Sequence, residues 1–147
     1  MSTSWSTPRP RRVFLDSSGY LALVNRNDAH HDEARSSWTR LTDEHWHTFT
    51  TNFVIAEAHA LFLARLGQAS ATAFLRQFGQ SSTTVVRVSA RDEERARSII
   101  FQYGDKGFSL TDATSFAVME RLRIGAAFTF DSHFVQYGFA LVTAGAG

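Results

Sequence analysis

The sequence predicts a layered α/β fold with a mainly parallel central sheet, and three observations support this. Short β-branched or apolar runs alternate with longer segments of helical periodicity along the chain. Gly67 and other turn residues separate the segments. The chain has 147 residues, of which 44% are hydrophobic, and this suits one domain with a single core. We therefore expect one layered α/β domain with four to five strands in its sheet.

The expected strands are short and rich in β-branched or aromatic residues; they cover residues 12–15, 47–51, 83–88, 126–130 and 140–143. The expected helices carry apolar residues three and four positions apart; they cover residues 17–24, 30–41, 52–66, 69–78, 90–103, 110–122 and 132–137. Ser17 and Ser18 can cap the first helix, and Asn52 can cap the third. Gly67 is the expected C-terminal cap of that third helix.

Composition excludes several classes of protein. There are no cysteines, so disulfides and thiolate metal sites are excluded and a reducing compartment is expected. Residues 1–11 are rich in Ser, Thr, Pro and Arg, and we expect a flexible tail there rather than a signal peptide, followed by one domain over residues 12–147. No stretch is apolar enough for a membrane span, so we expect a cytoplasmic protein. The net charge of +1 does not by itself indicate a nucleic-acid binder.

Two acidic residues follow expected strands directly. Asp16 comes after the strand 12–15, and Asp131 comes after the strand 126–130. Ligands of open α/β sheets bind outside the carboxyl ends of the strands, so both carboxylates are candidates for a site. Each could instead only cap the helix that follows it, which is a common role for Asp.

Two further acidic residues share the apolar faces of helices. Glu57 lies among apolar residues at helical spacing, where a carboxylate without a partner is costly; an arginine partner or a helix rotated toward solvent would be the structural alternatives. Asp112 shares a face with Phe108 and Phe116. Its alternative is a capping box with Ser109.

Together the four acids predict chemistry that none of them predicts alone. A parallel sheet can bring all four to one edge, where each close pair of carboxylates repels by roughly 4 kcal/mol at about 4 Å. Protonation or cations relieve this repulsion, and oxygen ligands without His or Cys select Mg²⁺ or Mn²⁺. Such a metal suits phosphodiester hydrolysis, because it activates water and stabilises charge on the phosphate.

Four segments resemble the motifs of PIN-domain endoribonucleases, and most closely those of VapC-type toxins from bacterial toxin–antitoxin pairs. In each segment the acid stands where the family has its metal-binding acid: Asp16 in Phe14–Ser18, Glu57 in Thr51–Glu57, Asp112 in Phe108–Met119 and Asp131 in Ala127–Phe134. The resemblance extends over residues 13–142. Positions that are polar in the family are occupied by Ser17, Ser109 and Thr129, which we expect to orient the acids or their waters.

The resemblance implies a PIN-like (Rossmann-like) three-layer fold, with helices on both sides of the central sheet. It also implies a Mg²⁺-dependent ribonuclease, with Mn²⁺ as the other candidate ion. Asp16, Glu57, Asp112 and Asp131 would be its catalytic metal ligands, holding one or two metals. It implies cleavage of single-stranded RNA, a toxin role, a cognate antitoxin and a homodimer. The alternatives are a housekeeping RNA-processing nuclease, or a module that binds RNA or a partner without cutting.

Other motifs give weaker evidence of function. The pairs His30–His31 and His45–His47 have no third metal ligand at a recognisable spacing, so we expect them at the surface or in packing. His133 lies two residues after Asp131 and is a candidate substrate contact. The alternating charges of residues 91–97 indicate a solvated helix face. A phosphoacceptor receiver domain is excluded, because residues 88–90 are Val-Ser-Ala where that fold requires an Asp.

Overall fold

The computed structural model describes residues 11–142 and confirms the predicted α/β class. Its five strands form one sheet in the order β3-β2-β1-β4-β5, and every neighbouring pair is parallel. The strands are β1 (Arg12–Leu15), β2 (His47–Thr51), β3 (Thr84–Val86), β4 (Ala126–Phe128) and β5 (Ala140–Leu141). The expected tail falls outside the described residues except for Arg11, whose backbone carbonyl accepts a hydrogen bond of 2.8 Å from His47 N.

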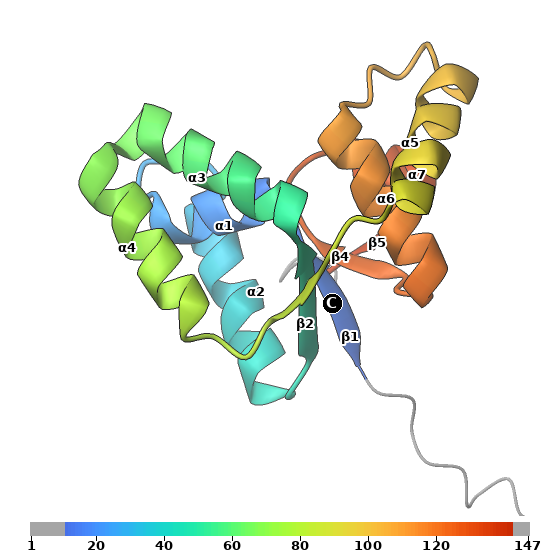
Figure 1. The fold of residues 1–147 in the computed structure, drawn as a ribbon. Helices are drawn as coiled ribbons and strands as arrows, with labels where there is room; N and C mark the ends of the chain where they lie inside the picture. Colours follow the sequence, from blue (N-terminus) through green and yellow to red (C-terminus); the bar gives the residue numbers. More distant parts are fainter. Residues whose placement is uncertain (1–10, 143–147) are drawn as a thin grey trace, which may run out of the picture.

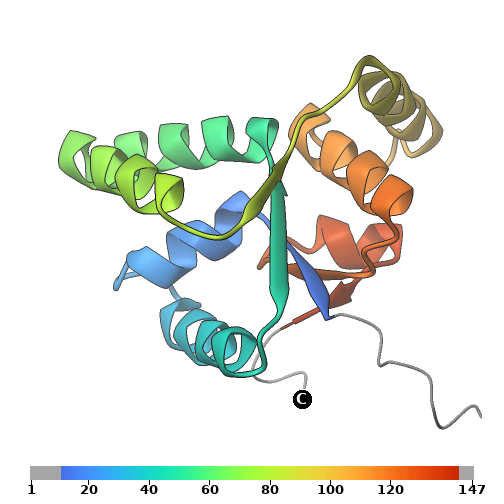
Figure 2. The ribbon, with the colours of Figure 1, turned by 60° about the horizontal axis from the view of Figure 1, so that its bottom comes forward.

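The helices form the two outer layers of the fold. They are α1 (Ser17–Val24), α2 (His31–Asp43), α3 (Asn52–Leu66), α4 (Gln68–Gly79), α5 (Ala90–Gln102), α6 (Leu110–Leu122) and α7 (His133–Tyr137). Figures 1 and 2 show α1 to α4 on one side of the sheet and α5 to α7 on the other. None of the helices within residues 11–142 combines the length and apolarity that a membrane crossing requires.

The central strand β1 is buried on both faces, as a parallel strand between two helical layers must be. Val13 and Leu15 belong to the core beneath α1 and α2, whereas Phe14 belongs to the core beneath α5, α6 and α7. All three side chains have no solvent exposure. The order of the sheet places β2 and β4 directly beside β1, so the carboxyl ends of these three strands meet at the centre of one edge.

Several local expectations needed correction. The cap of α3 is Thr51, whose hydroxyl accepts from Val54 N at 3.1 Å, and Asn52 instead accepts from Val88 N at 2.9 Å. Gly67 ends α3 as expected, at a φ of 92° that favours glycine.

The charged segment 91–97 is also not a uniformly solvated face. Asp92 is only 3% exposed and pairs with Arg121 of α6 through two hydrogen bonds, of 2.9 and 2.8 Å. Its pKa is lowered by this guanidinium. The pair therefore ties α5 to α6, rather than lying free in solvent.

Candidate functional site

Asp16 lies at the end of β1 and is buried beneath hydroxyl groups. Its Oδ2 accepts hydrogen bonds from Ser18 Oγ at 2.9 Å and from Thr129 Oγ1 at 2.7 Å. Asp16 occupies the N-cap position of α1, but its side chain makes no capping hydrogen bond. Ser17 and Ser18, the expected caps, donate instead to Glu57 and Asp16. The capping alternative is therefore wrong for Asp16, and its carboxylate is held by other contacts.

Burial dominates the electrostatics of Asp16. The side chain is only 2% exposed, and desolvation raises its pKa to about 6, although the two hydroxyl donors oppose this shift. The negative charge of Asp112 raises the pKa further. These two acids come from segments 96 residues apart, and the fold brings them close enough to repel each other.

Glu57 lies on α3 and accepts a hydrogen bond from Ser17 Oγ. The residue is half-buried, and its hydrogen-bond partner among the described residues is this hydroxyl rather than an arginine. Because Ser17 directly follows Asp16, the hydrogen bond joins the first turn of α1 to α3 beside the buried Asp16. Glu57 thus borders the same region as Asp16.

Asp112 both caps its helix and faces the site. Ser109 Oγ accepts from Asp112 N at 3.0 Å, and Asp112 Oδ2 accepts from Ser109 N at 3.3 Å, which completes the capping box. The same Oδ2 lies 2.8 Å from His133 Nδ1. The capping alternative is therefore correct for Asp112, and it holds the carboxylate in position.

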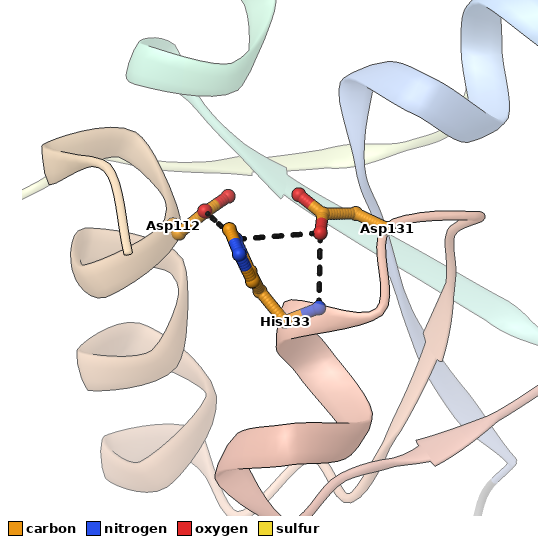
Figure 3. Close-up of side chains that lie close together, drawn as sticks. All are labelled: Asp112, Asp131 and His133. Atoms are coloured by element: carbon orange, nitrogen blue, oxygen red, sulfur yellow. Dashed lines mark hydrogen bonds and ion pairs between the residues drawn. The ribbon is translucent and has the colours of Figure 1, made fainter. Parts of the chain in front are cut away.

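Asp131 follows β4 and faces Asp112 across the imidazole of His133, as Figure 3 shows. Its Oδ1 accepts from His133 N at 2.9 Å and lies 3.4 Å from His133 Nδ1. Its own backbone N donates to Thr129 Oγ1 at 3.0 Å. Ligand atoms of Asp112, Asp131 and His133 all lie within 4.8 Å of one another.

The four acids are therefore arranged in two parts, Asp112 with Asp131 and Asp16 with Glu57. Asp112 and Asp131 form a compact group with His133, and among the described residues this group includes neither Asp16 nor Glu57. Thr129 connects the parts, because it donates to Asp16 and accepts from the backbone of Asp131.

Burial and neighbouring charges determine the electrostatics of the compact group. Burial raises the pKa of Asp112, and the neighbouring charge of Asp131 adds to this effect. His133 opposes it, and the hydrogen bond to Asp112 raises the pKa of His133 in turn. The contacts with the two carboxylates therefore favour the protonated form of the imidazole.

The expected supporting contacts of Ser17, Ser109 and Thr129 are confirmed, since each hydroxyl bonds an acid or its backbone. Sequence reasoning missed Ser18, which bonds Asp16, contacts Thr129 at 3.0 Å and accepts from Phe130 N at 2.9 Å. It also gave His133 only a substrate role. Its position two residues after Asp131 was the available signal.

These residues fit a divalent cation. The buried Asp112 and the half-buried Asp131, with the buried Asp16 nearby, provide the oxygen donors that such ions require. A cation would offset both the burial and the repulsion between acids that raise the pKa values of Asp16 and Asp112. The imidazole adds a nitrogen donor. A centre of this kind can bind a phosphate group and activate water next to it.

Comparison with known proteins gave one clear group of relatives. No family model matches the chain. The chain is 33% identical over 130 residues to the 23S rRNA-specific endonuclease VapC20 of Mycobacterium tuberculosis, covering 88% of this chain and 97% of that protein. The crystal structure of this VapC20, described as a sarcin–ricin loop cleaving toxin, superimposes with a TM-score of 0.81 over 87% of this chain and 96% of that one. FitAcB from Neisseria gonorrhoeae shares the fold, with a TM-score of 0.62 at 14% identity over 88% of this chain and 95% of that one.

Proposed function

Because this chain belongs to the VapC family of toxin endoribonucleases, we propose that it cuts RNA at a divalent-metal centre held by Asp16, Glu57, Asp112 and Asp131. It is thus a ribonuclease, a hydrolase that breaks phosphodiester bonds. The observation that carries the proposal is the meeting of Asp112 and Asp131 beside the buried Asp16, although these residues come from three separate segments.

The side chains of this centre would have two roles, to bind the metal and to orient its ligands. Asp16, Glu57, Asp112 and Asp131 would hold Mg²⁺ or Mn²⁺. When bound, the ion supplies a Lewis acid that lowers the pKa of water and neutralises charge on the phosphate. Thr129 and Ser18 fix the orientation of the Asp16 carboxylate, and the capping box fixes that of Asp112. This preorganisation reduces the rearrangement that binding requires.

The relatives suggest the substrate and partners. VapC20 is specific for 23S rRNA and cleaves its sarcin–ricin loop, so we propose a structured RNA with an exposed single-stranded loop as the substrate here. We further propose that a cognate antitoxin neutralises the chain, that the chain acts as a homodimer, and that it works in the cytoplasm, where ribosomal RNA lies.

The test is the Asp112→Asn variant, assayed on a 23S rRNA sarcin–ricin hairpin and on total RNA with Mg²⁺ or Mn²⁺. We expect wild-type protein to release fragments with 5′-phosphates, and the variant to lose at least about 100-fold in rate, because it removes a charge that the metal needs. Asp105→Asn is the matched control, since Asp105 is exposed and pairs only with Lys106 among the described residues. It should cleave like the wild type.

The alternatives give different results in the same assay. Undiminished cleavage by Asp112→Asn would contradict the assigned site. Binding of RNA with no metal-dependent fragments would indicate a binding module instead of a nuclease. A third result would be RNA cleavage with no growth arrest on expression and no inhibition of the cleavage by the protein that the neighbouring gene encodes. It would indicate a housekeeping nuclease.

A further inference from the structure

The imidazole of His133 occupies a place that suits a metal ligand better than a substrate contact. We propose that His133 coordinates the divalent ion directly through Nδ1. The centre is then a mixed nitrogen and oxygen site that favours a first-row transition ion such as Mn²⁺ over Mg²⁺. This rests on the proposed function only in requiring that a cation binds at Asp112 and Asp131.

The distances match the spacing of ligands around one ion. An octahedral ion with bonds of about 2.1 Å holds adjacent ligand atoms about 3 Å apart and opposite ones about 4.2 Å apart. His133 Nδ1 lies 2.8 Å from Asp112 Oδ2 and 3.4 Å from Asp131 Oδ1. All three ligand atoms lie within 4.8 Å of one another. One ion bound between these three atoms can therefore replace the two contacts of Nδ1 with the carboxylate oxygens, after small movements of the side chains.

The ring is also held in place before any ion arrives. His133 begins α7, and its backbone N donates to Asp131 Oδ1 at 2.9 Å. Phe108 packs edge-on against the ring, with centroids 5.2 Å apart and planes at 73°. The next residue, Phe134, is fully buried and anchors the helix. A ligand held in this way loses little conformational freedom on binding.

The chemistry of the donor then determines which ion is favoured. Carboxylates alone suit Mg²⁺ and Mn²⁺ about equally well by type, whereas imidazole nitrogen is a ligand for first-row transition ions and is seldom used by Mg²⁺. In a purely positional role, His133 would instead donate Nδ1–H to Asp112 and stay outside the coordination sphere. The two roles differ in whether a nitrogen atom is bonded to the ion.

Pulsed electron paramagnetic resonance of the Mn²⁺-loaded wild-type protein distinguishes them. We expect a ¹⁴N modulation from a directly bonded imidazole, which ¹⁵N-histidine labelling converts to the ¹⁵N pattern. The signal is specific, because all six histidines lie within the described residues and only His133 belongs to a group of potential metal ligands there. This measurement needs no variant, so it does not depend on how a substitution affects folding.

Variants provide the second arm, with calorimetric titration of Mn²⁺ and Mg²⁺ as the readout. His133→Asn should remove the nitrogen signal and weaken Mn²⁺ at least roughly 10-fold, with a smaller effect on Mg²⁺. His59→Asn is the matched control, because His59 lies two residues from Glu57 but outside the group of potential ligands. This variant should retain the nitrogen signal and the Mn²⁺ affinity. Mn²⁺ binding without a nitrogen signal would overturn this inference and leave the proposed nuclease intact. Binding of Mg²⁺ without binding of Mn²⁺ would also overturn this inference alone, whereas binding of neither ion would overturn both.

Discussion

Asp16 is the acid whose charge conflicts most with its surroundings. It is 2% exposed, and burial raises its pKa to about 6 even though two hydroxyls donate to it. A native protein retains such a group at a cost in stability, and functional sites are where that cost is commonly found.

The Asp16→Asn variant should therefore stabilise the metal-free protein at neutral pH. The folded pKa lies above the unfolded value of 3.8, so the wild type loses stability as the pH rises between about 4 and 6, by about 3 kcal/mol in total. The variant has no such loss. Urea unfolding of both proteins in EDTA, at pH 4.5 and pH 7.5, measures the difference. If the stability of the two proteins depended equally on pH, burial would not be raising the pKa of Asp16.

Thr129 is the residue that connects the two parts of the site. Thr129→Val preserves the shape and removes the hydroxyl that bonds Asp16 and the backbone of Asp131. We expect a loss of roughly 10- to 100-fold in the rate of RNA cleavage, the range typical when a partner of a metal ligand is removed. Thr129→Ser keeps the hydroxyl and should restore most of the rate. A fully active Thr129→Val would mean that the acids need no such support.

At the scale of elements, the close contact between α1 and β4 positions Asp16 and Ser18. A Cβ atom at Gly19 would lie 2.6 Å from both the carbonyl oxygen and a ring atom of Phe128. The first turn of α1 thus approaches β4 more closely than any residue with a side chain allows.

Gly19→Ala should therefore destabilise the protein by about 1–3 kcal/mol, the usual range for overpacking. Gly79→Ala is the matched control, because a Cβ there meets no atom within 4 Å and the residue ends α4. That substitution should be neutral or slightly stabilising. Urea denaturation of the two variants tests the contrast, and similar stabilities would contradict the close packing of α1 on β4.

The elements also show what the sequence could and could not predict. The strongly apolar segment 110–122 was predicted as a helix, which matches the observed Leu110–Leu122, but the strand predicted at 83–88 is only Thr84–Val86. Strand ends depend on which neighbour they pair with, and that information is not local. The partner of Asp92 was missed for the same reason, since Arg121 lies on the other side of a helix hairpin.

For the whole molecule, the alternating pattern was enough to predict that strand-end acids meet at one sheet edge. It could not predict that His133 enters the group, because this depends on the turn between β4 and α7. Nor could it predict that Glu57 would be bonded by Ser17. These contacts join distant segments, and only the packed fold brings them together.

Divalent ions should stabilise the whole fold, because they bind the native site and relieve repulsion that the unfolded chain lacks. At an ion concentration 100 times the dissociation constant, the gain is about 2.7 kcal/mol. Thermal unfolding with Mn²⁺ or Mg²⁺, against EDTA, should show a higher midpoint for the wild type and for Asp105→Asn. A similar rise in Asp112→Asn would show that the ions bind elsewhere.

The sheet order has a further consequence for when the site exists. β1 lies at the centre of the sheet, and one of its neighbours, β4, is made more than a hundred residues later, with Leu15 paired to Phe128. A chain emerging from the ribosome therefore carries Asp16, Glu57 and Asp112 before it has the strand that brings Asp131 and Thr129 to them. The proposed centre in the growing polypeptide therefore stays incomplete until β4 pairs with β1.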